Sequence, residues 1–165
     1  MLHMPCGLPS YVRDSPFFVA KSIYYKYLLS LYVLPILKIE DMKKVIATPD
    51  APKAVGPYSQ AIEVNGTLYI SGQIPVNPAD GKVQEDIVAA AHQSLKNIGA
   101  ILKEAGMTYD NVVKTTVLLA DIADFKAVNE VYAEYFTGDK PARACYQAAA
   151  LPLGVKVEIE AIAVK

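Results

Sequence analysis

The stretch PARACYQAAALPLGVKVEIEAIAV, residues 141–164, decides the fold of the C-terminal part of the chain. Two extended segments flank a turn at residues 151–154, where Pro and Gly interrupt the apolar sequence. Because side chains alternate along a strand, Arg143, Cys145 and Gln147 share one face of the first segment. In the second segment every other residue is apolar, and the first three of the alternating positions are charged. The apolar set is Val155, Val157, Ile159, Ala161 and Ala163, and the charged set is Lys156, Glu158 and Glu160.

Arg143 is one of only two arginines in the chain, with Arg13, against 14 lysines. A planar guanidinium binds a carboxylate through two parallel hydrogen bonds and keeps its charge when partly desolvated. An arginine inside a predicted strand therefore favours a carboxylate-binding role. The alternative is a structural ion pair with Glu158 or Glu160, which the spacing allows equally well.

The composition excludes several classes of protein. At 165 residues the chain is long enough for one domain with a real core. Its net charge of −1 gives no reason to expect nucleic-acid binding through bulk charge. The two cysteines, Cys6 and Cys145, form neither a disulfide framework nor a metal site, which fits a reducing compartment. With no CxxC or HxxxH pattern, no protein-held metal is expected.

Residues 1–41 differ from the rest and hold five of the 11 tyrosines. Their apolar run, residues 27–37, is shorter than the ~20 residues that span a bilayer. No small-residue cleavage site follows it, and Arg13 is a single arginine where a mitochondrial presequence carries several. We interpret residues 1–41 as an extension outside the domain, arising from a misassigned start or a weak targeting segment. The domain is then 42–165, and the expected location is cytoplasmic, or mitochondrial if the extension is a genuine presequence.

The remaining elements follow from local signals. Residues 45–47 form a short strand, and prolines keep the loop after it from becoming helical. Residues 61–64 and 67–71 form a hairpin, because Asn65-Gly66 supplies the positive φ of a tight turn. A helix spans 87–105, with Gly106 as its end. His92 on this helix is expected to face solvent or to have a satisfied structural role, and not to be catalytic. A strand covers 112–119, and a second helix begins at its N-cap Asp124 and runs to residue 136.

The predicted order is β-β-β-α-β-α-β-β, an α+β domain with helices on one face of a mixed sheet. The other sheet face is moderately apolar, because Ile162 and Val164 lie on the Glu158 side. A face of this kind without covering helices predicts a partner subunit.

Five motifs resemble the Rid/YjgF family, and more closely its RidA branch of reactive-intermediate deaminases. They are GPYSQA (56–61), ISGQIPVNP (70–78), VVKTTVLLADIADFKAVNEVY (112–132), PARAC (141–145) and VKVEIEAIAV (155–164). The resemblance covers residues 42–165. It implies a chorismate-mutase-like fold and a homotrimer with a central barrel and three sites between subunits. It also implies hydrolysis of enamines and imines, such as 2-aminoacrylate, to 2-keto acids and ammonia without a cofactor.

The resemblance also implies roles for single residues. Arg143 grips the substrate carboxylate, and Glu158 orients or activates the attacking water. The backbone of Cys145, and not its thiol, contacts the substrate. The residues themselves allow two interpretations of that thiol: an ordinary buried and dispensable one, or one whose closeness to Arg143 favours the thiolate and sensitivity to oxidation. Glu160, two residues after Glu158, competes for the role at the water, and the residues alone do not separate the two.

Three further positions are implicated around the site by the same resemblance. Tyr58 lines the pocket from the neighbouring subunit, and Ser71 and Asn129 lie nearby. Tyr58 has an alternative role as a loop anchor, and Ser71 is as easily structural as functional. The chain departs from many relatives at Ala150, where an arginine is common, and in a short loop at residues 137–140, which could alter the cleft rim.

Other functions remain as alternatives. A non-catalytic trimer that binds small molecules such as keto acids would keep Arg143 but tolerate the loss of Glu158. A ribonuclease is disfavoured, because residues 42–165 carry 12 Lys and Arg against 14 Asp and Glu, a net charge of −2. Chorismate mutase activity is rejected, since a dianionic substrate calls for more than one arginine and this domain has only Arg143.

Overall fold

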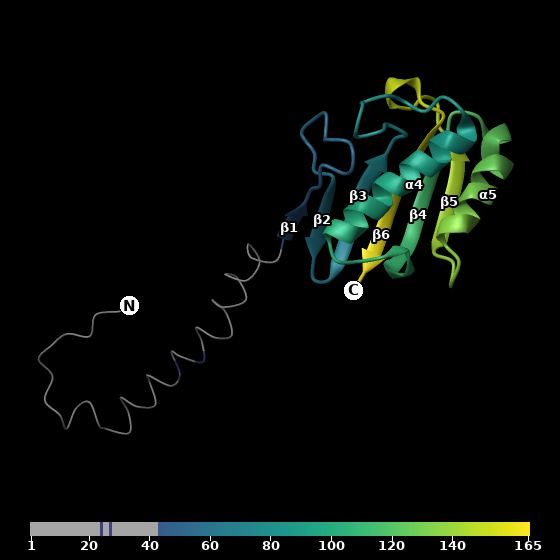
Figure 1. Cartoon of the computed structure of the whole chain (residues 1–165). Helices are drawn as coiled ribbons and strands as arrows, with labels where there is room; N and C mark the ends of the chain where they lie inside the picture. Colours follow the sequence, from purple (N-terminus) through teal and green to yellow (C-terminus); the bar gives the residue numbers. More distant parts are fainter. Residues whose placement is uncertain (1–23, 25–26, 28–42) are drawn as a thin grey trace, which may run out of the picture. The chain divides into compact units, whose positions relative to one another are not determined.

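In the computed structural model, which describes residues 43–165 together with Tyr24 and Tyr27, the elements follow the predicted order β-β-β-α-β-α-β-β (Figure 1). The strands are β1 (Lys43–Ile46), β2 (Ala61–Val64), β3 (Thr67–Gln73), β4 (Val112–Leu119), β5 (Ala142–Gln147) and β6 (Val157–Val164). The helices are α4 (Ile87–Glu104) and α5 (Phe125–Tyr135). Apart from Tyr24 and Tyr27, residues 1–41 lie outside the described residues, and so do the predictions made for them.

The strands form one six-stranded sheet in the order β1-β2-β3-β6-β4-β5. All neighbouring strands are antiparallel except β4 and β5, which are parallel. Parallel strands need a crossover, and α5 supplies it. The two C-terminal strands flank the turn at residues 151–154 as predicted, yet β4 lies between them in the sheet. Long-range pairing, which no local pattern encodes, decided this arrangement.

Local signals account for the ends of most elements. Asn65 and Gly66 have φ values of 52° and 76°, as the hairpin turn requires. The carboxylate of Asp86 accepts a hydrogen bond from the Ala89 amide at 2.9 Å and so caps α4. Asp124 lies at the N-cap of α5 as predicted, but its side chain makes no capping hydrogen bond. The turn just before α5, Ile122–Asp124, is capped by Asp121, whose carboxylate accepts a hydrogen bond from the Ala123 amide.

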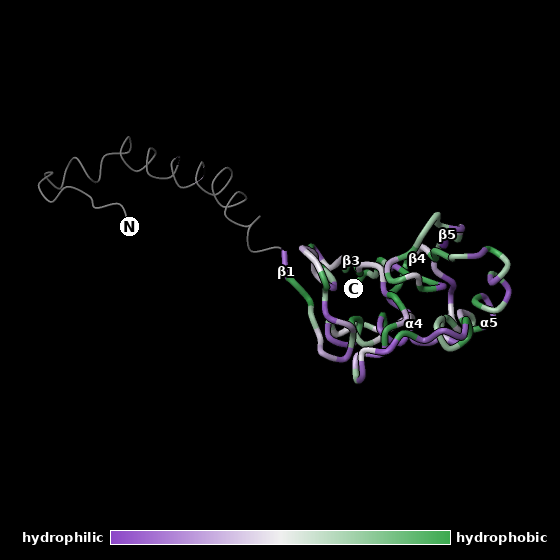
Figure 2. Tube along the Cα trace, turned by 90° about the horizontal axis from the view of Figure 1, so that it is seen from above, coloured by the Kyte–Doolittle hydropathy of each residue, from purple (hydrophilic) through white to green (hydrophobic). Residues whose placement is uncertain are grey.

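Both helices pack on the same face of the sheet, which gives a two-layer domain (Figures 1 and 2). The core lies between the layers, and its fully buried side chains include Leu68, Leu95, Ile98, Ile101, Leu119 and Ile159. His92 joins the two helices, since its Nδ1 lies 2.9 Å from the Tyr135 hydroxyl. That contact agrees with the structural role predicted for His92.

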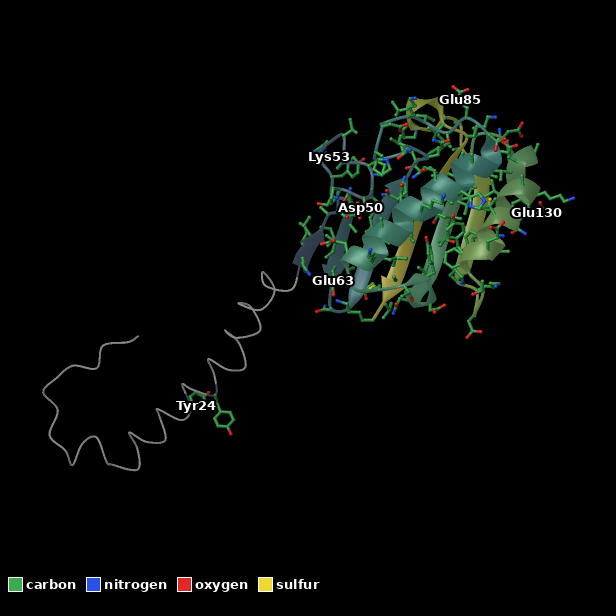
Figure 3. All side chains as sticks on the ribbon, in the orientation of Figure 1. Tyr24, Asp50, Lys53, Glu63, Glu85 and Glu130 are labelled. Carbon is green, nitrogen blue, oxygen red and sulfur yellow. The ribbon has the colours of Figure 1, made fainter. Side chains whose placement is uncertain are left out.

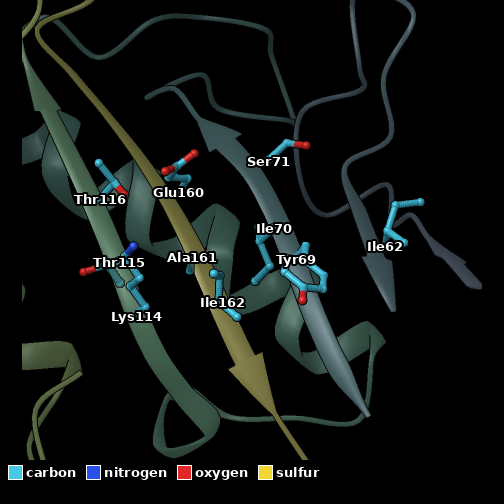
Figure 4. A pocket seen from close by; sticks show the side chains of 10 residues that line it. All are labelled: Ile62, Tyr69, Ile70, Ser71, Lys114, Thr115, Thr116, Glu160, Ala161 and Ile162. Carbon is cyan, nitrogen blue, oxygen red and sulfur yellow. The ribbon is translucent and has the colours of Figure 1, made fainter. Parts of the chain in front are cut away.

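Within residues 43–165, no helix covers the opposite face of the sheet. Ile62, Tyr69 and Ile162 face each other in register across β2, β3 and β6 on this open face. Tyr69 is 48% exposed, and a shallow cavity of about 270 Å³ runs over these strands and β4 (Figure 4). The uncovered apolar face that the sequence predicted is therefore present in the single chain.

Charged side chains mark the rim of the domain. Glu85 and Glu130 lie at its outer boundary, and both are exposed (Figure 3). Within the described part of the chain, no helix is both long and apolar enough to cross a membrane.

Candidate active site

Arg143 lies on edge strand β5 and points toward helix α5. Its Nη2 donates a hydrogen bond to Oδ1 of Asn129 at 2.8 Å. Its Cζ lies 4.6 Å from the centre of the Tyr132 ring and 5.6 Å from that of Phe125. Among the described residues the ion pair that forms joins Lys165 and Glu63, so Arg143 is not paired with Glu158 or Glu160. The structural ion pair considered from the sequence is absent there.

Sheet register explains why Arg143 points this way. Arg143 is opposite Thr115 on β4, which in turn is opposite Ala161 on β6. Residues opposite one another point to the same face, and Thr115 and Ala161 are buried beneath the helices. Arg143 thus ends a row of buried side chains, but its position on an edge strand leaves its guanidinium exposed.

Glu158 lies on β6 and points to the open face. Its carboxylate occupies the space above Gly72 on β3, where a β-carbon would overlap its oxygen and lie 2.7 Å from its Cδ. Burial raises the pKa of Glu158 above its ordinary value, and the neighbouring Glu160 carboxylate raises it further. A carboxyl group of this kind exchanges protons closer to neutral pH than an exposed one.

A cavity of about 580 Å³ adjoins Glu158 on the open face. It is lined by Val55, Tyr58, Ser71, Gly72, Ile74, Pro152, Leu153, Glu158 and Glu160. Polar groups surrounded by an apolar wall are typical of small-molecule sites.

The loop that carries Tyr58 is held by two polar side chains. The buried Gln60 accepts from the Thr48 amide at 2.7 Å, and its Nε2 lies 3.1 Å from the Ala51 carbonyl and 2.8 Å from that of Pro52. The Ser71 hydroxyl donates to the Ser59 carbonyl at 2.7 Å. Ser71 therefore anchors this loop and also lines the cavity.

The six residues nominated from the sequence fall into two groups within one chain. Arg143, Asn129 and Cys145 belong to the α5 side of the sheet, whereas Tyr58, Ser71 and Glu158 line the cavity on the open face. Arg143 and Glu158 project from opposite faces, so they cannot contact the same small molecule within one chain. We call the first group the clamp half and the second the carboxylate half.

The prediction that Arg143 favours the thiolate of Cys145 is wrong, because the pKa of this thiol is raised and not lowered. Cys145 faces the core layer, opposite Val117. Burial raises the pKa of the Cys145 thiol, and the Arg143 guanidinium lowers it only in part. The thiol form is therefore favoured, because the loss of hydration outweighs the nearby positive charge.

Sequence reasoning missed three residues that shape the site: Tyr132, Gly72 and Gln60. The spacing of Phe125, Asn129 and Tyr132 at i, i+4 and i+7 was a usable signal, because it places all three on one helix face. The contacts of Gly72 and Gln60 join segments distant in the chain, and no local pattern reports them.

Comparison with known proteins gives a consistent result. The sequence profile of the family described as "Endoribonuclease L-PSP" matches residues 48–165. A mouse protein named 2-iminobutanoate/2-iminopropanoate deaminase is 59% identical over 125 residues, which are 75% of this chain and 93% of the mouse protein. The chain belongs to the Rid/YjgF family. This confirms the resemblance found in the sequence.

Two solved structures of the Rid/YjgF family are similar to this one. A Rid family protein, YyfA from Yersinia pestis, is 51% identical with a TM-score of 0.73, covering 74% of this chain and 99% of that one. E. coli TdcF, solved with bound serine, is 43% identical with a TM-score of 0.72, covering 74% of this chain and 98% of that one. The fold is therefore that of Rid proteins.

Proposed function

We propose that the protein hydrolyses 2-imino acids, formed from enamines such as 2-aminoacrylate and 2-aminocrotonate, to 2-keto acids and ammonia. The mouse relative carries the name of this activity, and TdcF holds an amino acid of similar size. One observation carries the proposal for this chain: a fixed guanidinium and a half-buried carboxylate of raised pKa stand on opposite faces of one sheet. The first suits the substrate carboxylate and the second suits the attacking water.

The reaction is divided between Arg143 and Glu158. Arg143 binds the substrate carboxylate and orients the C=N bond. Glu158 accepts a proton from water as the water oxygen bonds to the carbon of the protonated imine, whose C=N electron pair moves to nitrogen and leaves a neutral carbinolamine. The protonated Glu158 then gives its proton to that nitrogen. Ammonia leaves with the C–N electron pair, the hydroxyl proton passes back to Glu158 as the C=O bond of the keto acid forms, and Glu158 releases this proton to ammonia or solvent. Orientation and proton transfer suffice because free imines already hydrolyse in water.

The site is completed by a second copy of the chain. The open face presents Ile62, Tyr69 and Ile162, an apolar surface suited to an identical partner. In the assembly, the clamp half of one chain meets the carboxylate half of the next, with Asn129 and Cys145 on one side and Tyr58 and Ser71 on the other. A head-to-tail contact of this kind forms a ring when the rotation from one copy to the next closes, and we assign that ring as the homotrimer that the family resemblance implies.

The functional domain in this proposal is residues 42–165, with residues 1–41 as an extension outside it. The profile match from residue 48 onward supports this boundary. The cytoplasm remains the expected compartment, and a mitochondrial location would follow if residues 1–41 acted as a presequence.

Subunit complementation tests this function and the divided site together. A PLP-dependent serine/threonine dehydratase generates 2-aminoacrylate, and keto-acid release is followed above the spontaneous rate. We expect Arg143→Ala and Glu158→Ala each to be inactive as the full-length protein. Unfolding them together and refolding the mixture should restore about one quarter of wild-type activity, because random assembly pairs an intact clamp half with an intact carboxylate half at that frequency.

The matched control mixes Arg143→Ala with the double variant Arg143→Ala/Glu158→Ala, which contains no clamp and should recover nothing. Wild-type protein taken through the same refolding sets the reference. A folded mixed oligomer without recovered activity would contradict the divided site. If the folded wild type binds a keto acid but does not accelerate keto-acid release, the deaminase hypothesis is wrong and the non-catalytic binding protein takes its place.

A further inference from the structure

Tyr132 is a buried residue of α5 that no reaction step uses. It is 5% exposed, and its ring lies under the guanidinium of Arg143, with 4.6 Å between the ring centre and Cζ. A guanidinium over an aromatic face is attracted by the ring quadrupole. The flat face of the Arg143 guanidinium therefore contacts Tyr132, and its edge donates a hydrogen bond to Asn129.

The Tyr132 ring is itself held from two sides. Its hydroxyl forms a hydrogen bond with the buried Thr115 hydroxyl at 2.8 Å, and its ring packs on Phe136 with centres 4.3 Å apart. Thr115 is also the residue opposite Arg143 in the sheet register. The contacts thus form a closed circuit from Arg143 across the sheet to Thr115, to the Tyr132 hydroxyl, and back through the ring to Arg143.

This circuit matters because Arg143 is exposed on an edge strand and would otherwise sample many rotamers. Immobilising such a side chain on binding costs conformational entropy, and a preformed position removes that cost. The Asn129 bond uses one guanidinium N–H, so donors remain for a carboxylate.

We propose that Tyr132 is a positioning residue, which holds the Arg143 guanidinium in the orientation that receives the substrate carboxylate. The proposal rests on the proposed function for its substrate. The chemical class it selects is a small monocarboxylate, 2-imino acid or 2-keto acid. Because the carboxylate is bound equally in the ground and transition states, losing the ring should raise KM and leave kcat nearly unchanged.

The test uses Tyr132→Met in the full chain, since a flexible methionine fills the gap without offering an aromatic face. We expect KM for the imine to rise by about 3- to 10-fold, and the Kd of 2-ketobutyrate, measured separately by calorimetry, to rise equally. The double variant Tyr132→Phe/Thr115→Val keeps the ring and should keep both constants within about twofold of wild type.

Phe136→Leu is the matched control for general damage to the core. Phe136 is 3% exposed and packs on Tyr132, yet it does not stack on Arg143. It should lower stability but raise KM by less than Tyr132→Met does, because leucine still packs against the Tyr132 ring and the ring stays under Arg143. In an Arg143→Lys background, Tyr132→Met should have a smaller effect on Kd, because an ammonium lacks the flat face that stacks.

An unchanged KM and Kd in Tyr132→Met would overturn the proposal, as would an equal rise in Phe136→Leu. If Tyr132→Met does not fold, Tyr132→Phe/Thr115→Val and Tyr132→Leu give the same comparison of ring kept against ring removed. The 2-ketobutyrate titration separates this question from the proposed function, because it needs no turnover. If the wild type shows no deaminase activity but the Kd of 2-ketobutyrate still rises in Tyr132→Met, the proposed function is wrong and the positioning role of Tyr132 stands.

Discussion

The clamp half and the carboxylate half solve opposite problems of positioning. Arg143 is exposed but its guanidinium is fixed within one chain, by Asn129 at its edge and Tyr132 at its face. Glu158 is half-buried, and the space for its carboxylate is created by a missing side chain at Gly72. The Arg143 guanidinium is positioned by the side chains that it contacts, whereas the Glu158 carboxylate is positioned by the space that Gly72 leaves free.

The difference follows from what each group has to do. A clamp that binds a carboxylate gains from rigidity, since a preorganised guanidinium loses little entropy on binding. A group that exchanges protons gains from a raised pKa, which burial and a second carboxylate supply for Glu158. The clamp half is complete in one chain, whereas the carboxylate half stays open to a partner. The following predictions test this contrast.

The largest expected effect comes from filling the space above Gly72. In Gly72→Ala the new methyl group overlaps the Glu158 carboxylate and forces it away from the cavity. We expect kcat for imine hydrolysis to fall by about 100-fold, within the range that general acid–base catalysis supplies. Stability should change little, because the atoms displaced belong to the end of a flexible side chain.

Gly56→Ala is the control for this prediction. A β-carbon at Gly56 would lie 3.5 Å from the Tyr58 ring, an ordinary contact, so kcat should stay near the wild-type value. Wild-type kcat in Gly72→Ala would show that the position of the Glu158 carboxylate does not limit the reaction.

A smaller effect is expected from Glu160→Gln. The negative charge of Glu160 disfavours ionisation of Glu158, so removing it lowers the pKa of Glu158. The base must be ionised, and the acid limb of the pH profile of kcat/KM should therefore move to lower pH. It should remain above the ordinary carboxyl range, because burial is the larger cause of the raised pKa.

Glu130→Gln provides the matched charge removal for the pH measurement. Glu130 is an exposed residue of α5 (Figure 3) and is not among the residues that line the cavity, so its loss should leave the acid limb in place. If instead Glu160→Gln abolished turnover and Glu158→Gln did not, the roles of the two carboxylates would be exchanged.

The smallest expected effect concerns Leu153 on the wall of the cavity. Leu153 has a φ of 56° and is 76% exposed, so it combines an unfavourable backbone conformation with little burial. Leu153→Asn should stabilise the folded chain by about 1 kcal/mol, because asparagine tolerates this conformation far better. Chemical denaturation of both proteins measures the difference.

Val55→Asn separates the backbone from the side chain in this comparison. Val55 lines the same cavity and is 94% exposed, and its φ is not positive. Its replacement should leave stability within about 0.5 kcal/mol of wild type. An equal gain in both variants would assign the effect to the lost apolar surface instead of the backbone of Leu153.

The sequence was a sufficient guide for most features that have a local signal. The Asn65-Gly66 turn, the end of α4 before Gly106 and the alternation in β6 all follow from conformational preference or strand period, and all are present. The error at Cys145 had a physical cause as well. Proximity to Arg143 was visible in the sequence, whereas the desolvation that outweighs it depends on burial.

The order of elements, the two faces of β6, the family and the residue types of the candidate site could all be read from the sequence. Those features depend on short-range periodicity and on motifs that can be read along the chain. The folded chain was needed to show that β4 separates β5 from β6, that Arg143 and Glu158 point to opposite faces, and that Tyr132 lies under the guanidinium. These depend on which strands pair and in what register, and a shift of one residue in register would exchange the two faces.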